Sequence, residues 1–433
     1  MTPAPARAFL ARCFAAALAR VDAEAAVRRA IARDGSSLSL AGEPVPEGAS
    51  LHVIAAGKAA AAMARALEDA AGDRIAGGIA VTRDGGELPL RRLPLRSGGH
   101  PVPDARSAEA GAAVLAAAAA ATPSDWLVVL LSGGASALLA RPLPGLSLAD
   151  LQATTSALLA SGAPIEELNA VRKHLTAVSG GRLAQATRAA RIAVLAVSDV
   201  LGDDPAVIGS GPCSADPTRY ADALAVLARR GLRGGVPAAV VAHLEAGARG
   251  ERPESAKPGD PALAGVSTRV LASNRDALAA ACTAARAEGV AALVLTGALR
   301  GEARVAGARL AGLARAAAPR RPTLVAAGGE TTVTVRGPGR GGRCQELALA
   351  AALGLAGFER ATLLAAGTDG SDGPTDAAGG YADGGTLARS PLDAEGALAS
   401  NDSHRFLASA GDLFRTGPTR TNALDLALLL LAP

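Results

Sequence analysis

Short apolar runs that end in glycine or in a small polar residue recur along the first half of the chain. They lie at 51–57, 75–82, 127–134 and 192–199. Ala- and Leu-rich stretches of helical character separate these runs, and this pattern predicts buried strands that alternate with helices. Such alternation is typical of an α/β domain with a largely parallel sheet.

The pattern breaks over residues 246–262, where Gly, Pro and charged residues replace the apolar positions. Similar apolar runs then return at 267–274, 291–297, 322–335 and 361–370. Clusters of Gly, Pro and charge between regular segments are typical of linkers and exposed loops. We therefore predict a first domain over 1–245, a linker over 246–262 and a second α/β domain over 263–433.

The N-terminal segment is apolar enough to resemble a signal peptide. Arg12 interrupts its apolar region, however, while Leu10, Phe14, Leu18 and Val21 fall at helical spacing. Apolar residues at this spacing favour an amphipathic helix packed on the body of the protein over a secretion signal.

Composition excludes several classes of protein. The net charge is +4, with no run of five or six basic residues, and aromatic residues make up only 2% of the chain. A nucleic-acid partner is therefore not expected. The four cysteines lie far apart without a CxxC pair, which argues against a metal cluster or a disulfide framework and fits a reducing cytoplasm. No apolar run reaches the roughly 18 residues of a membrane span.

Candidate functional residues follow the predicted strands, because ligands of open α/β sheets bind beyond the carboxyl ends of the strands. These positions hold one lysine, several carboxylates and several glycine turns. They are Gly57, Lys58, Ser132, Gly133, Gly134, Ala135, Ser136, Ser198, Asp199, Gly328, Gly329, Glu330 and the segment 367–370. Backbone N–H donors, a fixed cation and carboxylates that can hold Mg²⁺ are what phosphate chemistry requires.

Two of these segments raise the question of a bound anion. The sequence at 127–139, LVVLLSGGASALL, predicts a buried strand, a glycine turn and the start of a helix, where a phosphate could bind; it could also be only a tight turn. Lys58 lies at the start of another predicted helix, where a cation is unfavourable unless an anion offsets it. The alternative is a solvated lysine.

Charged residues elsewhere allow both a functional and a structural interpretation. Asp199 ends a strand and is the best placed of its loop for catalysis, whereas Asp204 is interpreted as a solvated loop charge. The segment 169–184 predicts one helix that presents Arg172 and Lys173 and ends at a pair of glycines. An ordinary basic helix face is equally compatible with it.

The segment 337–342 matches the glycine pattern G-x-G-x-x-G of dinucleotide-binding loops. The stretch before it alternates like a half-exposed strand, and three arginines crowd the loop, among them Arg343. An arginine-bearing loop suits a carboxylate or a phosphate better than a dinucleotide, because guanidinium binds either in bidentate fashion. In the Asp- and Gly-rich segment 365–384, Asp369 follows an apolar strand directly and is the candidate functional acid.

Taken together and in order, these motifs resemble the class II glycerate 2-kinases, which carry a C-terminal MOFRL domain and are often labelled hydroxypyruvate reductases. The stretches that carry the resemblance span nearly the whole chain. They are GKAAAAMA, SGGASALL, NAVRKHLTAVSGGRLA, SDVLGDDPAVIGSGPCSADPT, GGETTVTVRGPGRGGRCQELALA, GTDGSDGPTDAAGGYAD and NDSHRFLASAGDLFRTGPTRTNALDL. The chain departs from the family pattern at Ala135, where glycine is usual, and at Cys344, where asparagine is usual.

The resemblance implies a larger Rossmann-like N-terminal domain, a smaller C-terminal α/β domain and an active site in the cleft between them. It implies transfer of the γ-phosphoryl group of ATP to the 2-hydroxyl of D-glycerate with Mg²⁺, by a cytoplasmic monomer or homodimer without nucleic-acid or membrane partners. Carried over by motif position, the catalytic residues are Lys58, Asp199 and Arg343.

Other roles are assigned to the remaining candidates. The nucleotide phosphates would contact Gly57, Ser132, Gly133, Gly134, Ala135, Ser136, Gly328 and Gly329. The substrate would contact Arg172, Lys173 and Arg343. The metal would be held by Asp199, Glu330 and Asp369. The alternative function is an NAD(P)H-dependent hydroxypyruvate reductase that uses the glycines of 337–342, and a non-enzymatic ligand-binding regulator is a third hypothesis.

Overall fold

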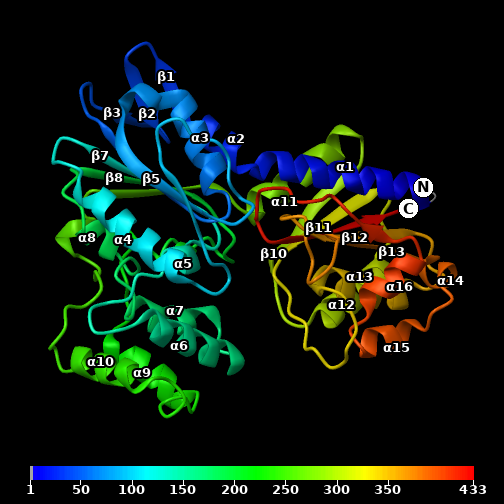
Figure 1. Cartoon of the computed structure of the whole chain (residues 1–433). Coiled ribbons are helices and arrows are strands. Elements are labelled where there is room, and N and C mark those ends of the chain that lie inside the picture. Colours follow the sequence, from blue (N-terminus) through cyan, green and yellow to red (C-terminus); the bar gives the residue numbers. More distant parts are fainter. Residues whose placement is uncertain (1–2) are drawn as a thin grey trace. The chain divides into compact units, whose positions relative to one another are not determined.

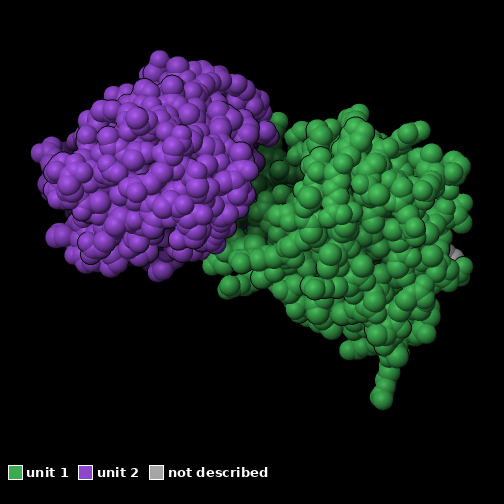
Figure 2. Space-filling view, turned by 90° about the horizontal axis from the view of Figure 1, so that it is seen from below, with its two compact units in different colours: residues 1–22, 199–202, 272–433 green, residues 23–198, 203–271 purple. Residues whose placement is uncertain are grey.

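The computed structural model describes residues 3–433, which form two compact units (Figure 1). Unit 1 comprises residues up to 22, 199–202 and 272–433, and unit 2 comprises 23–198 and 203–271 (Figure 2). The units therefore divide the chain at other points than predicted. The segment 246–262 lies inside unit 2, where the Ala256 amide donates to Gly180 O at 2.9 Å. Its backbone is held by hydrogen bonds, so it does not link the units.

Unit 2 contains the helices and strands from α2 to β9. They are α2 (Ala23–Ala30), β1 (Ile31–Asp34), β2 (Ser37–Leu40), β3 (Glu43–Val45), β4 (Leu51–Ala56), α3 (Ala60–Ala71), η1 (Gly72–Arg74), β5 (Ile75–Arg83), β6 (Leu95–Gly98), α4 (Ala105–Ala119), β7 (Trp126–Leu131), α5 (Ala135–Leu138), α6 (Leu148–Ala160), α7 (Ile165–Lys173), α8 (Arg182–Gln185), β8 (Arg191–Val197), η2 (Ile208–Ser210), α9 (Tyr220–Arg229), α10 (Ala238–Ala248), η3 (Pro261–Leu263) and β9 (Val266–Ala272). The predicted strands of the first half are all present.

The main sheet of unit 2 has the strand order β6-β5-β4-β7-β8-β9, and its pairs from β6 to β8 are parallel. Numbered along the chain within this sheet, the order is 3-2-1-4-5-6, which is that of doubly wound nucleotide-binding sheets. The order reverses between β4 and β7, because the chain adds strands first on one side of β4 and then on the other. Ligands of such sheets bind at this switch point.

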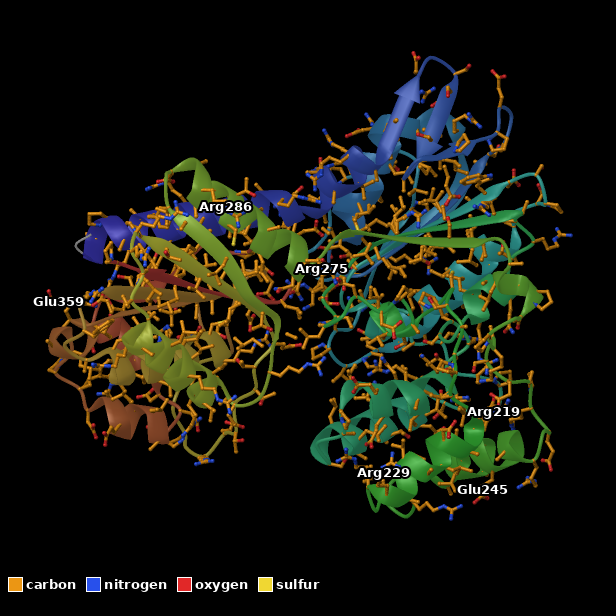
Figure 3. The ribbon with its side chains drawn as sticks, turned by 180° about the vertical axis from the view of Figure 1, so that it is seen from behind. Arg219, Arg229, Glu245, Arg275, Arg286 and Glu359 are labelled. Atoms are coloured by element: carbon orange, nitrogen blue, oxygen red, sulfur yellow. The ribbon has the colours of Figure 1, made fainter. Side chains whose placement is uncertain are left out.

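A helical layer also belongs to unit 2. Helices α6, α7, α9 and α10 pack around the buried ring of Tyr220 and a set of leucines and valines. Charged side chains such as Arg229 on α9 and Glu245 on α10 lie on the outside (Figure 3). The ion pairs that these surface side chains form contribute little to stability. Burial of the apolar side chains therefore holds the layer together.

Unit 1 is built around a second, mixed sheet. Its elements are α1 (Pro3–Val21), α11 (Asn274–Ala287), β10 (Ala291–Leu299), α12 (Ala303–Ala316), β11 (Thr323–Gly329), α13 (Arg343–Leu355), β12 (Ala361–Gly367), β13 (Gly379–Asp383), α14 (Thr386–Arg389), α15 (Ala394–Ala399), α16 (Ser403–Ser409), β14 (Leu413–Phe414) and β15 (Asp425–Leu431). The strand order is β10-β11-β15-β12-β13-β14. Strand β15 runs antiparallel between β11 and β12, so its first residue lies at their carboxyl ends.

Helices cover both faces of this sheet, with α1 and α11 on one face and α12 and α13 on the other (Figure 1). The predicted N-terminal helix is confirmed, since Leu10, Phe14 and Val21 are buried within it. Among the described residues no helix is both long and apolar enough to span a membrane.

Two predicted boundaries are wrong. The run 322–335 is a strand only as far as Gly329, and beyond it only a single bridge joins Thr332 to Glu302. The segment 169–184 is not one helix, because α7 ends at Lys173 and a separate short helix, α8, begins at Arg182 after Gly181.

Close packing at the end of β11 can be tested by a substitution of Gly328. A Cβ on Gly328 would lie 2.0 Å from Asn274 Oδ1, and the Asn274 amide nitrogen donates to the carbonyls of Ala423 and Asp425. Gly328→Ala should lower the free energy of unfolding by about 1–3 kcal/mol, the usual cost of overpacking. Urea unfolding followed by circular dichroism measures this change.

The matched control is Gly312→Ala, because Gly312 lies in α12 with open space around its Cβ position. Alanine there should be neutral or should stabilise the helix by about 0.5–1 kcal/mol. Equal unfolding midpoints for the two variants would contradict the packing argument.

Candidate functional site

Two strand ends are joined at the switch point of the unit 2 sheet. The Lys58 amide, just after β4, donates to Gly133 O at 2.8 Å, just after β7. The Ala59 amide donates to Ser132 Oγ at 3.0 Å. The two turns predicted from sequence therefore form one structure.

Glycine is required at two positions of this structure. Gly57 has φ +126°, and a Cβ on it would lie 2.2 Å from Ser132 Oγ. Gly134 has φ +88°, and a Cβ there would lie 2.9 Å from the ring of His100. Both positions combine a left-handed backbone with no room for a side chain, so only glycine lets the turns approach this closely.

The backbone of the turn leaves a row of unused donors. The amides of Gly133, Gly134, Ala135 and Ser136 donate to no acceptor within the described residues 3–433. The helix that begins here, α5, has only four residues, which is shorter than expected, so its dipole adds little. Consecutive free amides themselves form an anion-binding concavity.

The charges around the turn are positive or neutral. Within residues 3–433 the Lys58 ammonium makes no ion pair. Burial, together with Lys58 and Arg83, lowers the pKa of His100 to about 4, so its imidazole is neutral at pH 7. A cation without a carboxylate partner, beside free amides, favours an anionic ligand.

A second loop reaches the turn from the segment after β8. Ser136 Oγ lies 2.7 Å from Ser210 Oγ, which donates to Asn169 Oδ1 on α7 at 2.9 Å. Ser210 has φ +61° between two glycines that also have positive φ. A non-glycine residue in this conformation is strained, and such strain concentrates at functional sites.

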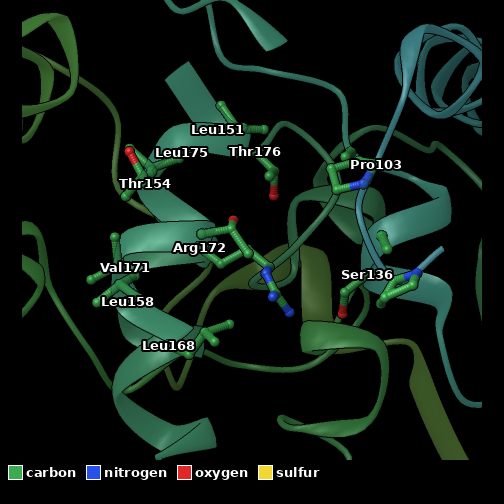
Figure 4. Close-up of a pocket in the computed structure, with 14 residues that line it drawn as sticks. Pro103, Ser136, Leu151, Thr154, Leu158, Leu168, Val171, Arg172, Leu175 and Thr176 are labelled. Carbon is green, nitrogen blue, oxygen red and sulfur yellow. The ribbon is translucent and has the colours of Figure 1, made fainter. Parts of the chain in front are cut away.

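The two basic residues at the end of α7 have different surroundings. Lys173 is buried and lies 3.4 Å from Asp216, which also accepts from Ser255 and Thr218. Arg172 instead lines a cavity beside Ser136 (Figure 4). The structure thus brings Arg172 near the turn, whereas Lys173 belongs to a buried polar cluster.

His174 belongs to the same buried cluster as Lys173. It is fully buried, with Nδ1 2.7 Å from Ala170 O and Nε2 3.2 Å from Glu254. These contacts give His174 a structural role.

Arg343 is the centre of the polar residues in unit 1. It begins α13, and its guanidinium donates to both carboxylate oxygens of Asp425 and to Glu330 Oε1 at 2.7 Å. Burial opposes its charge, but Asp425 and Glu330 outweigh burial and raise the pKa of Arg343 above its usual range. Glu330 is exposed and held by this arginine.

Asp425 and Asp369 converge on the end of β12. A Cβ on Gly367 would lie 3.4 Å from Oδ1 of each carboxylate. Asp369 also accepts from the amide and the hydroxyl of Ser371. Asp199 accepts a hydrogen bond at 3.3 Å from Nδ2 of Asn422, a residue of the loop that leads into β15. The acidic candidates of unit 1 therefore lie around the start of β15.

No group of three or more His, Cys, Asp or Glu side chains suited to a metal ion occurs within residues 3–433. Mg²⁺ commonly keeps several waters and uses only one or two carboxylates. Asp369, which makes no ion pair within residues 3–433, fits such a site better than Glu330 and Asp425, because Arg343 already holds both of these.

Cys344 lies beside the arginine site, at the start of α13. All four cysteines of the chain are free and buried. Burial, and next the charge of Asp425, raises the pKa of the Cys344 thiol well above its usual range. The thiol is therefore neutral at pH 7, and it lines a small cavity together with Asp425 and Gly329.

Sequence reasoning missed four residues that the fold places at these sites. They are His100, Asp372, Asn422 and Asp425. Asp425 starts a strand, whereas the carboxylates predicted from the sequence follow strands. Because β15 is antiparallel to its neighbours, its first residue reaches the same edge as their last ones.

The fold and the site together define an α/β protein with a glycine turn of free amides at the switch point of a doubly wound sheet. Residues 9–245 match a domain of unknown function, DUF4147, and residues 323–425 match the MOFRL family. The chain belongs to the class II glycerate kinase family that combines these two domains.

Relatives and a solved structure agree with this assignment. A glycerate 2-kinase of Pyrococcus horikoshii is 38% identical over 96% of this chain and 95% of its own length. A protein of Agrobacterium vitis named "Putative hydroxypyruvate reductase" is 41% identical over 88% of this chain and 86% of its own. The crystal structure of a glycerate kinase from Thermotoga maritima superposes with a TM-score of 0.86 at 36% identity, covering 99% of this chain and 100% of that one.

Asp372 gives a prediction about pH. It accepts from the amides of Cys344 and Gln345 at the start of α13. Burial raises its pKa to about 6 although these amides oppose the rise. The folded state then binds more protons than the unfolded state between pH 4 and 6, so the contribution of Asp372 to stability is present at low pH and is lost as the pH rises through about 6. Relative to Asp372→Asn, the wild type should therefore be more stable at pH 4 than at pH 7.

The control for this pH dependence is Asp376→Asn. Arg415, followed by His404, lowers the pKa of Asp376 to about 2, so its contribution is already complete above pH 5. Urea unfolding at several pH values should give a constant difference between this variant and the wild type from pH 5 to 7. The same flat profile for Asp372→Asn would refute the assigned shift.

Proposed function

We propose that this protein is a glycerate 2-kinase that transfers the γ-phosphoryl group of ATP to the 2-hydroxyl of D-glycerate, giving 2-phosphoglycerate and ADP. The observation that carries the proposal is the row of four free amides beside the unpaired Lys58 at the switch point of the unit 2 sheet. The names of its relatives in Pyrococcus and Thermotoga support the choice of glycerate as acceptor.

In this proposal the phosphates of ATP accept hydrogen bonds from the 133–136 amides. Lys58 neutralises charge that develops on the transferred group. Phosphoryl transfer needs positioning and charge stabilisation more than covalent chemistry by the protein, and fixed amides and a fixed ammonium supply both. Gly57 and Ser132 act indirectly, by holding the two turns together.

The unit 1 residues supply the remaining groups. Asp199 accepts the proton of the 2-hydroxyl or helps to hold Mg²⁺, and Asp369 is a second metal ligand. Mg²⁺ would neutralise phosphate charge when bound. Arg343 contacts a phosphate or a carboxylate, while Glu330, Gly328 and Gly329 shape its surroundings.

We further propose that catalysis requires both units, with a Rossmann-like N-terminal part and a MOFRL part acting on the same substrates. Lys58 belongs to unit 2, whereas Asp199, Arg343 and Asp369 belong to unit 1.

The reductase alternative lacks support at its glycines. Cβ atoms on Gly337, Gly339 and Gly341 would overlap residues 400–403, and one on Gly342 would overlap Asp372. Close packing within unit 1 thus explains these glycines without a dinucleotide. They also do not follow a regular strand, because β11 ends at Gly329.

The direct test is ADP release from ATP and Mg²⁺ with D-glycerate, with the product passed to enolase in the absence of a mutase. We expect enolase to consume the product, because only 2-phosphoglycerate is its substrate. ADP without enolase consumption would move the phosphate to the 3-position, and no ADP would refute the proposal.

Lys58→Ala should lower kcat by about 100- to 1000-fold, the usual effect of removing one group that stabilises transition-state charge. Its circular dichroism spectrum should match that of the wild type, since the Lys58 ammonium makes no ion pair within residues 3–433. Lys257→Ala removes the same chemical group in the same unit and should keep near-normal turnover. Comparable activity in both variants would contradict the role of Lys58.

Asp199→Asn should also lose most turnover while it remains folded, because the amide neither accepts a proton nor carries charge to a metal. The control is Asp204→Asn in the same loop, where the carboxylate only accepts from the Ala206 amide. Steady-state kinetics at saturating ATP distinguish the two. Similar kcat values would remove Asp199 from the mechanism.

A further inference from the structure

A cavity in unit 2 lies beside the turn at the switch point (Figure 4). Most of its wall is apolar and comes from α6 and α7. The largest apolar side chains of the wall are Leu151, Leu158, Leu168, Val171 and Leu175. Its polar lining consists of Ser136, Arg172 and three threonines, and no carboxylate lines it.

Arg172 brings an uncompensated charge into this cavity. Its guanidinium points from α7 toward Ser136 (Figure 4) and makes no hydrogen bond or ion pair with any residue between 3 and 433. Burial lowers its pKa to about 10, so it remains charged at pH 7. A half-buried cation without a partner is costly, and an anionic ligand would remove that cost.

Thr176 brings an unused hydroxyl into the same cavity. Its side chain is 2% exposed, and Oγ1 has no hydrogen-bond partner. Thr154 also lines the cavity, but its Oγ1 donates to Asp150 O at 2.7 Å. The two threonines thus differ, because only the Thr154 hydroxyl has a hydrogen-bond partner within residues 3–433.

We propose that this cavity is the acceptor site, in which Arg172 binds the carboxylate of the 2-hydroxy acid and Thr176 hydrogen-bonds its 3-hydroxyl. This assignment rests on the proposed kinase function. Arg172 and Thr176 are four residues apart, while Ser136 of the phosphate-binding turn lines the same cavity. Holding both ends of a three-carbon acid leaves its 2-hydroxyl as the group presented to the turn.

The assignment has two consequences that the phosphate-binding turn alone does not have. It directs phosphorylation to the 2-position, because the 3-hydroxyl is engaged by Thr176. It also predicts selection of glycerate over D-lactate, which has the same carboxylate and 2-hydroxyl but lacks the 3-hydroxyl. A site built to bind a substrate hydroxyl discriminates strongly against the analogue without it.

The test compares Thr176→Val with Thr154→Val, by calorimetric binding of D-glycerate and D-lactate and by kcat/KM for D-glycerate. Thr176→Val should weaken D-glycerate binding about ten- to a hundredfold, the effect of one buried hydrogen bond, and leave D-lactate binding within about twofold. Thr154→Val should change neither the binding of D-glycerate nor the binding of D-lactate. Valine should not lower the melting temperature at position 176, because the hydroxyl it replaces has no partner.

Arg172→Gln should weaken binding of both acids and raise KM for D-glycerate while KM for ATP stays within about twofold. Thr176→Ser should restore part of the glycerate preference, which loss of packing alone would not predict. Equal effects of Thr176→Val on both acids, or no difference from Thr154→Val, would overturn the assignment.

The two proposals fail in different ways. If the wild type phosphorylates D-glycerate but the Thr176 and Arg172 variants bind it normally, the kinase stands and the acceptor site is refuted. If the wild type binds D-glycerate with the expected dependence on Thr176 but releases no ADP, the site stands and the kinase is refuted. Absence of D-glycerate binding by the wild type refutes both.

Discussion

The ends of the parallel strands β4 and β7 approach each other closely, and this contact determines the row of free amides in unit 2. Gly57 has no room for a Cβ against Ser132, and the Lys58 and Ala59 amides are used to hold the β7 turn in place. The Ser132 hydroxyl accepts one of these amides, and the following four amides, 133–136, have no acceptor within residues 3–433. A row of free amides therefore results from how the sheet is closed at its switch point.

The cations at the candidate sites of the two units differ in whether a carboxylate pairs with them. In unit 2, Lys58 and Arg172 have no carboxylate partner within residues 3–433, and His100 stays neutral near Lys58. In unit 1, Arg343 is neutralised by Asp425 and Glu330. An unpaired, partly desolvated cation is more costly than a paired one. This contrast favours anion binding in unit 2 over anion binding by Arg343.

The mixed sheet of unit 1 shows how one antiparallel strand changes a site. Insertion of β15 between β11 and β12 places Asp425 between the ends of its two neighbours. Arg343 and Asp369 then approach it from α13 and from the loop after β12. Without β15, the ends of two parallel strands would present backbone and glycine alone. The last strand of the chain therefore completes the polar cluster that earlier segments begin.

The sequence by itself determined the strands and the helices around them, because short apolar runs bounded by glycine report burial locally. It also singled out Lys58, the 132–136 turn, Asp199 and Asp369 as candidates because each follows such a run, and Arg343 because it lies in a glycine- and arginine-rich loop. Only the tertiary structure decided the partners: that Lys173 is held by Asp216, that Glu330 is held by Arg343, and that Thr176 and Arg172 share a cavity with Ser136. Pairing and burial depend on residues brought together from distant segments, and local patterns carry no record of those contacts.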